Sequence, residues 1–216
     1  MTNVIAINGS PRKTWNTATL LERALEGAAE KGASTRLVHL YELGYKGCVS
    51  CFACKRRGGS SYGVCALRDE LTPLLEDIRT ASAIILGSPI YFGNVTGEMR
   101  SFLERLQFPY LTYEEPSRTL FPGTLQTAWI YTMNVPEAWI TQLGYERMFE
   151  DNERLLGRLF GHSQSLMSYD TYQFEDYSKV VATRFDVAEK EKHRQEVFPE
   201  DCRRAHELGA SLVAPA

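Results

Sequence analysis

The stretch N-V-I-A-I-N-G-S-P-R-K-T-W-N-T-A-T-L, residues 3–20, decides the fold. Its apolar run, residues 4–7, has the length and β-branched composition of a buried strand. A turn of Asn, Gly, Ser and Pro follows at residues 8–11, and an apolar helical stripe begins at Leu20. A strand, a tight turn and a helix in this order bind phosphate groups, because free N–H groups and the positive end of the helix dipole face the anion. The stretch therefore predicts a phosphate site.

Length and composition limit what the rest of the chain does. A chain of 216 residues with 44% hydrophobic and 24% charged residues is typical of one globular domain with a large core. The net charge of -3 and the lack of a long basic run give no reason to expect a nucleic-acid partner. No apolar stretch approaches the ~20 residues of a membrane helix. Because a strand is expected within a few residues of the N-terminus, we expect no signal peptide. We expect a cytoplasmic protein without a membrane partner.

Strand and helix patterns alternate along the chain. Strands are expected at residues 4–7, 35–40, 83–86, 126–133 and 164–169. Helices are expected at residues 16–31, 68–79, 96–106, 136–160 with an interruption near Gly144, and 187–213 with a break near Phe198. Five strands separated by helices form a parallel sheet covered on both faces. Right-handed crossovers make this the doubly wound, flavodoxin-like α/β fold with strand order 2-1-3-4-5.

One domain, residues 1–216, accounts for this pattern. It carries a cysteine-rich insertion at residues 47–66 and a C-terminal helical extension at residues 187–214. Such a sheet binds its ligand at the carboxyl ends of its strands. The loops after the first four strands emerge at that edge, and they carry the phosphate-type turn, the cysteines, residues 88–94 and residues 132–134. We expect these loops to lie together.

The glycine pattern of the first loop excludes two common nucleotide sites. A P-loop needs Gly-x-x-x-x-Gly-Lys-Ser/Thr and a dinucleotide fingerprint needs Gly-x-Gly-x-x-Gly, and neither follows Gly9. Hydroxyl, amide and guanidinium donors are present instead at Ser10, Arg12, Asn16 and Thr17. Asn16 or Thr17 also stands where it can cap the helix, and a turn that merely caps explains the same residues. The loop alone does not name a ligand.

Two motifs resemble the NADPH-dependent FMN reductase family. Gly9-Ser10-Pro11-Arg12, followed by Asn16-Thr17, resembles the family's FMN phosphate loop, with Trp15 inside the spacer. Ser-Pro-Ile-Tyr-Phe at residues 88–92, with Gly-Glu-Met-Arg-Ser-Phe-Leu-Glu-Arg at residues 97–105, resembles its second FMN loop and the helix after it. The resemblance implies phosphate contacts from Ser10, Arg12, Asn16, Thr17 and Ala18. It implies flavin-ring contacts from Pro89, Ile90, Tyr91, Phe92, Gly93 and Asn94, to which the position of Thr132 after the fourth strand adds one more.

The resemblance also implies an activity. The expected protein is an FMN-dependent oxidoreductase that takes a hydride from NAD(P)H and passes electrons to a quinone, a flavin, a metal ion or a nitro compound. The flavin performs the hydride chemistry, so no catalytic side chain is assigned. The resembling family commonly forms dimers or tetramers, which implies a homo-oligomer. Two alternatives stay open: an iron–sulfur flavoprotein that carries electrons between proteins, and a non-redox module that binds a phosphate ligand.

The cysteines raise a separate question. Cys48, Cys51 and Cys54 have the spacing of the first three ligands of bacterial ferredoxins, and Cys65 completes four thiolates for a [4Fe–4S] cluster or zinc. The segment resembles that of iron–sulfur flavoproteins, although their last gap is shorter than the ten residues between Cys54 and Cys65. Free thiols or a redox disulfide explain the same pattern. Cys202 is expected to be a small buried hydrophobe.

Overall fold

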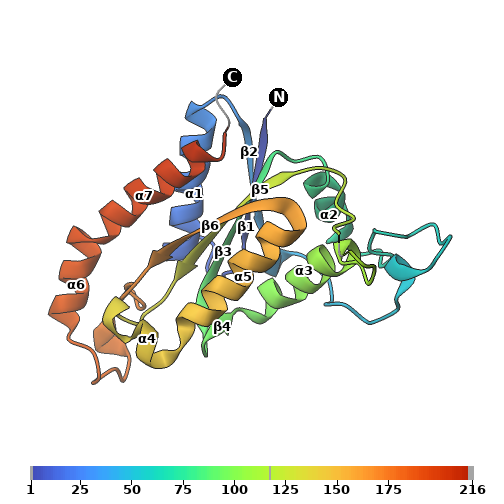
Figure 1. The fold of residues 1–216 in the computed structure, drawn as a ribbon. Helices are drawn as coiled ribbons and strands as arrows, with labels where there is room; N and C mark the ends of the chain where they lie inside the picture. Colours follow the sequence, from blue (N-terminus) through green and yellow to red (C-terminus); the bar gives the residue numbers. More distant parts are fainter. Residues whose placement is uncertain (1, 117, 214–216) are drawn as a thin grey trace.

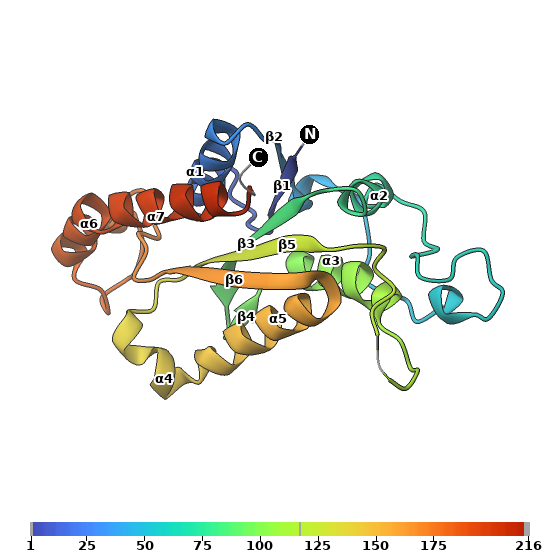
Figure 2. The same cartoon turned by 45° about the horizontal axis from the view of Figure 1, so that its top comes forward.

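The computed structural model describes residues 2–116 and 118–213. A twisted sheet forms the centre of the molecule, with helices on both faces (Figures 1 and 2). Its parallel strands are ordered β2-β1-β3-β5-β6. Their bounds are Asn3–Asn8 for β1, Ser34–His39 for β2, Ala83–Tyr91 for β3, Leu125–Thr132 for β5 and Gly161–Ser168 for β6. Because β5 and β6 are the fourth and fifth main strands, the predicted order 2-1-3-4-5 and the flavodoxin-like fold are confirmed.

Side chains of β1 alternate between two apolar cores, one on each face of the sheet. Val4 and Ala6 face the core that contains α1 and α7, whereas Ile5 and Ile7 face the core that contains α2, α3 and α5. The longer helices are α1 (Asn16–Glu30), α3 (Gly97–Gln107), α5 (Tyr145–Phe160), α6 (Val187–Glu196) and α7 (Phe198–Ser211). The shorter ones are α2 (Thr72–Ile78) and α4 (Ile140–Leu143). Within the described residues no helix is long and apolar enough to cross a membrane.

Most predicted boundaries agree with the structure to within a few residues. The interruption expected near Gly144 is confirmed, because this glycine ends α4 with a positive φ of 70°. The break near Phe198 is confirmed as well, since Val197 separates α6 from α7. Residue 214, the predicted end of the C-terminal extension, lies outside the described residues.

The helix predicted at residues 68–79 begins later than expected. Its first turn is replaced by local side-chain contacts: Asp69 N donates to Thr72 Oγ1 at 3.0 Å, and Leu71 N donates to Asp69 Oδ1 at 3.2 Å. These side chains satisfy the backbone N–H groups outside a helix, so the helix begins only at Thr72.

Strand β3 is longer than predicted. It continues through Gly87, Ser88 and Pro89, because these residues still pair with β5, up to the pair Pro89–Thr132. It then turns back at Phe92 and Gly93, whose φ angles are 50° and 77°, into the two-residue strand β4 (Asn94–Val95). Residues 90–94 therefore form a hairpin instead of an open loop.

Helices α1 and α7 touch through their backbones. A Cβ added at Gly209 would lie 1.7 Å from Ala24 O, and one at Gly27 would lie 2.0 Å from His206 O. Glycine is required at both positions, since any side chain would push the two helices apart.

Replacing Gly209 with alanine should therefore lower the free energy of unfolding by about 2 kcal/mol, the usual effect of overpacking. Urea denaturation followed by circular dichroism measures the change. Gly157→Ala is the matched control, because a Cβ at this helical glycine meets no atom within 4 Å. It should raise stability by about 0.5–1 kcal/mol. Equal effects of the two substitutions would contradict the close approach of the helices.

Candidate functional site

The carboxyl ends of β1, β3, β5 and β6 surround a polar cavity of about 120 Å³, here called the phosphate pocket. Eight residues selected from the sequence line it: Ser10, Arg12, Asn16, Thr17, Pro89, Ile90, Tyr91 and Thr132. Met133 and Asn134, from the loop expected at residues 132–134, also line it, as do three residues that were not selected: Trp15, Thr171 and Gln173. The strand order thus brings together loops that are more than a hundred residues apart in sequence.

Hydrogen bonds fix the turn after β1. Asn8 Oδ1 accepts from Ser10 N at 2.9 Å, and Ser10 Oγ accepts from Arg12 N at 3.1 Å. Gly9 N donates to Gly87 O at 2.8 Å, and a Cβ at Gly9 would lie only 2.9 Å from Met99 Cε. A bare glycine is required here because the turn lies directly against β3 and α3.

Thr96 joins this turn to the start of α3. Its buried hydroxyl donates to Gly9 O at 2.7 Å and accepts from Met99 N at 3.3 Å, which caps the helix. The position of α3 and the shape of the turn therefore depend on the same side chain.

Asn16 and Thr17 do not cap α1, contrary to the capping alternative. The N-cap residue is Trp15, with no side-chain cap. Thr17 instead shares a 2.8 Å hydrogen bond with Thr132 across the phosphate pocket, and Asn16 Nδ2 donates to Tyr172 O at 2.9 Å. Arg194 of α6 donates to Asn16 Oδ1 at 2.7 Å and orients that amide.

The loop after β6 closes the phosphate pocket. Arg12 Nη1 donates to Gln173 O at 2.5 Å, and Trp15 Nε1 donates to Tyr172 O at 3.0 Å. Sequence reasoning missed this loop because its contacts are made by backbone carbonyls, which any residue supplies. The position of the loop after a fifth parallel strand was the one available signal.

Four of the residues selected for FMN do not line the phosphate pocket. Ala18, in the first turn of α1, is fully buried and does not line the phosphate pocket. Phe92, Gly93 and Asn94 form the tip of the hairpin, with the Phe92 side chain fully exposed. Of the seven predicted ring contacts, four line the phosphate pocket: Pro89, Ile90, Tyr91 and Thr132.

The cysteine segment leaves the sheet edge and follows α3. Tyr45 Oη donates to Glu98 O near the start of that helix at 2.6 Å, and Cys48 N donates to Glu104 Oε2 near its end at 3.0 Å. Eleven helical residues span about 16 Å. The expected meeting of all four loops is therefore wrong for this segment, which projects from the side of the molecule in Figure 1.

Four thiols line one small cavity beside the end of α3. Cys48 and Cys51 are exposed, Cys65 is half-buried, and burial raises the pKa of the Cys54 thiol. All are free, and no three His, Cys, Asp or Glu side chains among residues 2–116 and 118–213 are grouped to hold a metal ion. The predicted donor set thus shares a cavity, but its thiols are not arranged as a ligand set.

Arg105 closes the base of the cysteine segment. Its fully buried guanidinium donates to Cys65 Sγ at 3.2 Å, to Lys46 O at 3.1 Å and to both carboxylate oxygens of Asp69. Burial alone would raise the pKa of Asp69, but the hydrogen bonds and charge of Arg105 lower it. One side chain of α3 thus holds both ends of the segment.

Residues 2–121 match the sequence profile of the NADPH-dependent FMN reductase family. The chain belongs to this family. The matched region contains the turn after β1, the hairpin of β3 and the cysteine segment, so the resemblance read from the two motifs is confirmed. The family is one of flavoprotein oxidoreductases that use FMN.

Curated relatives share part of the chain. An iron–sulfur flavoprotein of Methanocaldococcus jannaschii is 36% identical over 102 residues, which are 47% of this chain and 50% of the relative. One of Archaeoglobus fulgidus is 38% identical over 102 residues, 47% of each chain. The chain therefore spans about half the length of the curated relatives that it matches.

Solved structures resemble the whole chain. An NAD(P)H:quinone oxidoreductase from Methanothermobacter marburgensis has a TM-score of 0.71 at 16% identity, covering 98% of this chain and 99% of that one. An FMN-dependent NADH-azoreductase from Bacillus anthracis, solved with FMN, has a TM-score of 0.65 at 14% identity, covering 99% and 100%. At these identities the likeness establishes the flavodoxin-like fold.

Replacing Arg105 with methionine should lower the free energy of unfolding by about 3 kcal/mol, because the Asp69 carboxylate and nearby carbonyls lose their partner. Arg100→Met, on the exposed face of the same helix, is the matched control and should change stability by at most about 0.5 kcal/mol. Urea denaturation measures both. Comparable losses in the two variants would mean that the buried contacts of Arg105 do not stabilise the fold.

Proposed function

We propose that this protein is an FMN-dependent NAD(P)H oxidoreductase. The phosphate pocket is the observation that supports it, because buried hydroxyl and amide donors converge there beside the guanidinium of Arg12. Bound FMN would accept a hydride equivalent from NAD(P)H and supply two electrons to an acceptor. Membership of an FMN reductase family supports the same assignment.

The residues of the phosphate pocket fit the phosphate end of FMN. Ser10, Asn16 and Thr17 offer neutral donors, and Arg12 offers a charge-assisted one. In the structure Arg12 and Asn16 donate to carbonyl oxygens of the loop after β6. A phosphate dianion is the stronger acceptor, so these donors would turn to it when FMN binds.

The other walls suit the flavin ring. Pro89 and Ile90 supply an apolar surface at the end of β3, and Tyr91 adds a half-exposed aromatic side chain. Thr132 is held by Thr17 and forms the opposite side. These residues would hold and orient the ring while leaving one side open to reduced nicotinamide.

A second candidate function is electron transfer by an iron–sulfur flavoprotein. The four thiols that share one cavity favour it, and so does the neighbouring guanidinium of Arg105, which would offset thiolate charge. The donor chemistry fits a four-cysteine cluster, although the thiols would have to move together. The two curated relatives described above are named iron–sulfur flavoproteins.

Location and assembly are part of the proposal. A reducing cytoplasm would keep all five cysteines as the free thiols seen here. A homo-oligomer stays a prediction that light scattering on the purified protein checks.

Replacing Thr17 with valine, or Arg12 with alanine, should weaken FMN binding at least about tenfold, because each removes a phosphate donor worth about 1.5 kcal/mol. Quenching of FMN fluorescence during titration measures the affinity. Thr19→Val and Arg23→Ala are the controls. Both residues lie on α1, as Thr17 does, but outside the phosphate pocket, and both variants should bind FMN normally. The proposal fails if no flavin absorbance remains after reconstitution, or if both site variants keep their affinity.

The cysteine proposal has its own test. Anaerobically reconstituted protein should contain iron near about four atoms per chain, with broad absorbance that dithionite bleaches. Cys65→Ser should lose most of the iron, whereas Cys202→Ser, far from the cavity, should keep it. Iron-free protein with reactive thiols would instead show that the cysteines hold no cluster. Zinc found by metal analysis would show that the cysteines bind zinc in place of iron. Stopped-flow mixing with NADH and NADPH separates the two functions, since an electron carrier need not oxidise either.

A further inference from the structure

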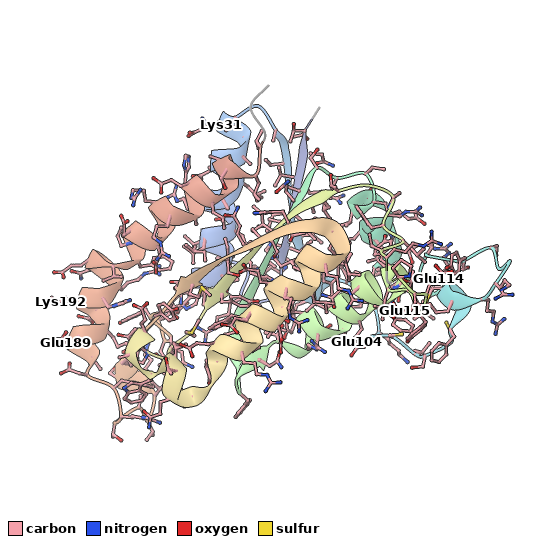
Figure 3. All side chains as sticks on the ribbon, in the orientation of Figure 1. Lys31, Glu104, Glu114, Glu115, Glu189 and Lys192 are labelled. Carbon is pink, nitrogen blue, oxygen red and sulfur yellow. The ribbon has the colours of Figure 1, made fainter. Side chains whose placement is uncertain are left out.

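Helix α6 is held against the molecule mainly by polar side chains. Its sequence, V-A-E-K-E-K-H-R-Q-E, contains few apolar residues, and within this helix, which is described in full, Lys190 is the one buried residue. Lys190, His193 and Arg194 stand at positions i, i+3 and i+4, so they share one face of the helix. Glu189 and Lys192 lie at the outer edge of the molecule in Figure 3. The opposite, inner face of α6 is therefore basic.

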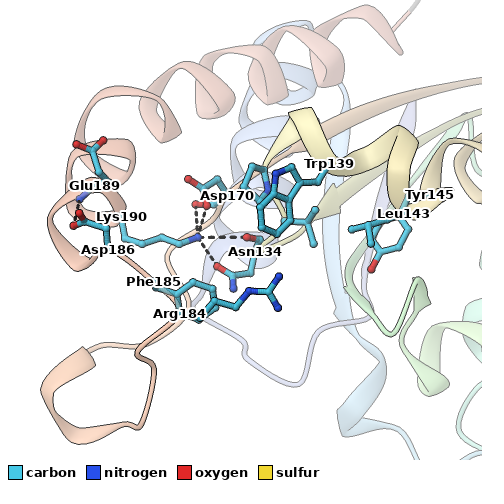
Figure 4. A pocket seen from close by; sticks show the side chains of 12 residues that line it. Asn134, Trp139, Leu143, Tyr145, Asp170, Arg184, Phe185, Asp186, Glu189 and Lys190 are labelled. Atoms are coloured by element: carbon cyan, nitrogen blue, oxygen red, sulfur yellow. Dashed lines mark hydrogen bonds and ion pairs between the residues drawn. The ribbon is translucent and has the colours of Figure 1, made fainter.

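Two side chains of the inner face dock α6 at the carboxyl edge of the sheet. The Lys190 ammonium donates to Asn134 Oδ1 in the loop after β5 and to Asp170 Oδ1 in the loop after β6 (Figure 4). His193 Nε2 lies 3.0 Å from Tyr169 O, just beyond the end of β6. These contacts place the third basic side chain, that of Arg194, beside the first turn of α1.

Arg194 touches the wall of the phosphate pocket from behind. Its half-buried guanidinium lies 3.9 Å from the centre of the buried Phe198 ring, a favourable cation–π contact that restrains it. From there Nη1 donates to Asn16 Oδ1 at 2.7 Å. Asn16 lines the phosphate pocket, whereas Arg194 does not. The contact between Arg194 and a ligand in this pocket would therefore pass through Asn16.

Two contacts fix the orientation of the Asn16 amide. A guanidinium only donates hydrogen bonds, and a carbonyl oxygen only accepts them. Arg194 therefore binds the Oδ1 end, while Tyr172 O accepts from the Nδ2 end at 2.9 Å. A flipped amide would set donor against donor at Arg194 and acceptor against acceptor at Tyr172. Nδ2 is thus held as the donating end of a side chain that lines the phosphate pocket.

We propose that Arg194 is a positioning residue for the phosphate of FMN and acts through Asn16. By holding Oδ1, the guanidinium keeps Nδ2 oriented to donate to a phosphate oxygen, and it polarises the amide so that this donor is stronger. The inference rests on the proposed FMN function. It adds a residue outside residues 2–121, the region that matches the family profile. The C-terminal helices would thus contribute to the affinity for the cofactor.

Titration with FMN and with riboflavin, which lacks the phosphate, tests the role of Arg194. Arg194→Met should weaken FMN binding about fivefold, because the donor loses its fixed orientation, and should leave riboflavin binding unchanged. Arg194→Lys, which keeps a charged donor, should bind FMN more tightly than Arg194→Met. Lys192→Met removes the same charge from an exposed position of α6, so it is the matched control and should bind FMN normally. An equal loss of FMN and riboflavin binding in Arg194→Met would overturn the inference.

A double-mutant cycle shows whether Arg194 acts through Asn16. Asn16→Ala alone should weaken FMN binding about tenfold, and adding Arg194→Met should cause no further loss. Independent contributions would multiply to a loss of about fiftyfold, which would overturn the inference. If the wild-type protein binds no FMN, the proposed function and this inference fall together. If it binds FMN and Arg194→Met binds FMN as tightly, only the inference falls.

Discussion

The hydroxyl of Thr96 makes the contact on which both sites depend. It is almost completely buried, caps α3 through Met99 N and donates to the carbonyl oxygen of Gly9. The turn that would receive the phosphate and the helix that carries the cysteine segment are thus fixed to each other by one side chain. A buried hydroxyl without hydrogen-bond partners would lower the stability of the fold, so both contacts of Thr96 are favoured.

Helix α3 connects the turn after β1 with the cysteine segment. Its N-cap residue Thr96 contacts the turn after β1, and its last turn holds Cys48 through Glu104 and Cys65 through Arg105. A packed helix is a rigid element, so the distance between the two places changes little. If a cluster forms, it would lie on the flank of the domain, about 16 Å along the helix from the turn.

How much the sequence predicts depends on the range of the contacts involved. The turn at Gly9 and helix α1 follow from adjacent residues, and the strand order follows from general crossover rules. The extension of β3 past Gly87 and Pro89 was missed because these residues locally indicate a turn, whereas pairing with β5 keeps them extended. The contact of Arg12 with the backbone carbonyl of Gln173, which closes the phosphate pocket, could not be predicted from side chains. The cysteine segment lies away from the sheet edge partly because Arg105 binds Cys65, which is 40 residues away in sequence.

The glycine contact between α1 and α7 has a consequence for synthesis. Gly27 and Gly209 are 182 residues apart, so the apolar face of α1 stays uncovered until the last described helix has been made. Non-local contacts of this kind slow folding and leave apolar surface open to aggregation on the ribosome. Arg194, which orients Asn16, belongs to the same late segment. The turn after β1 and the helix that follows it therefore reach their final contacts only once α6 and α7 have been made.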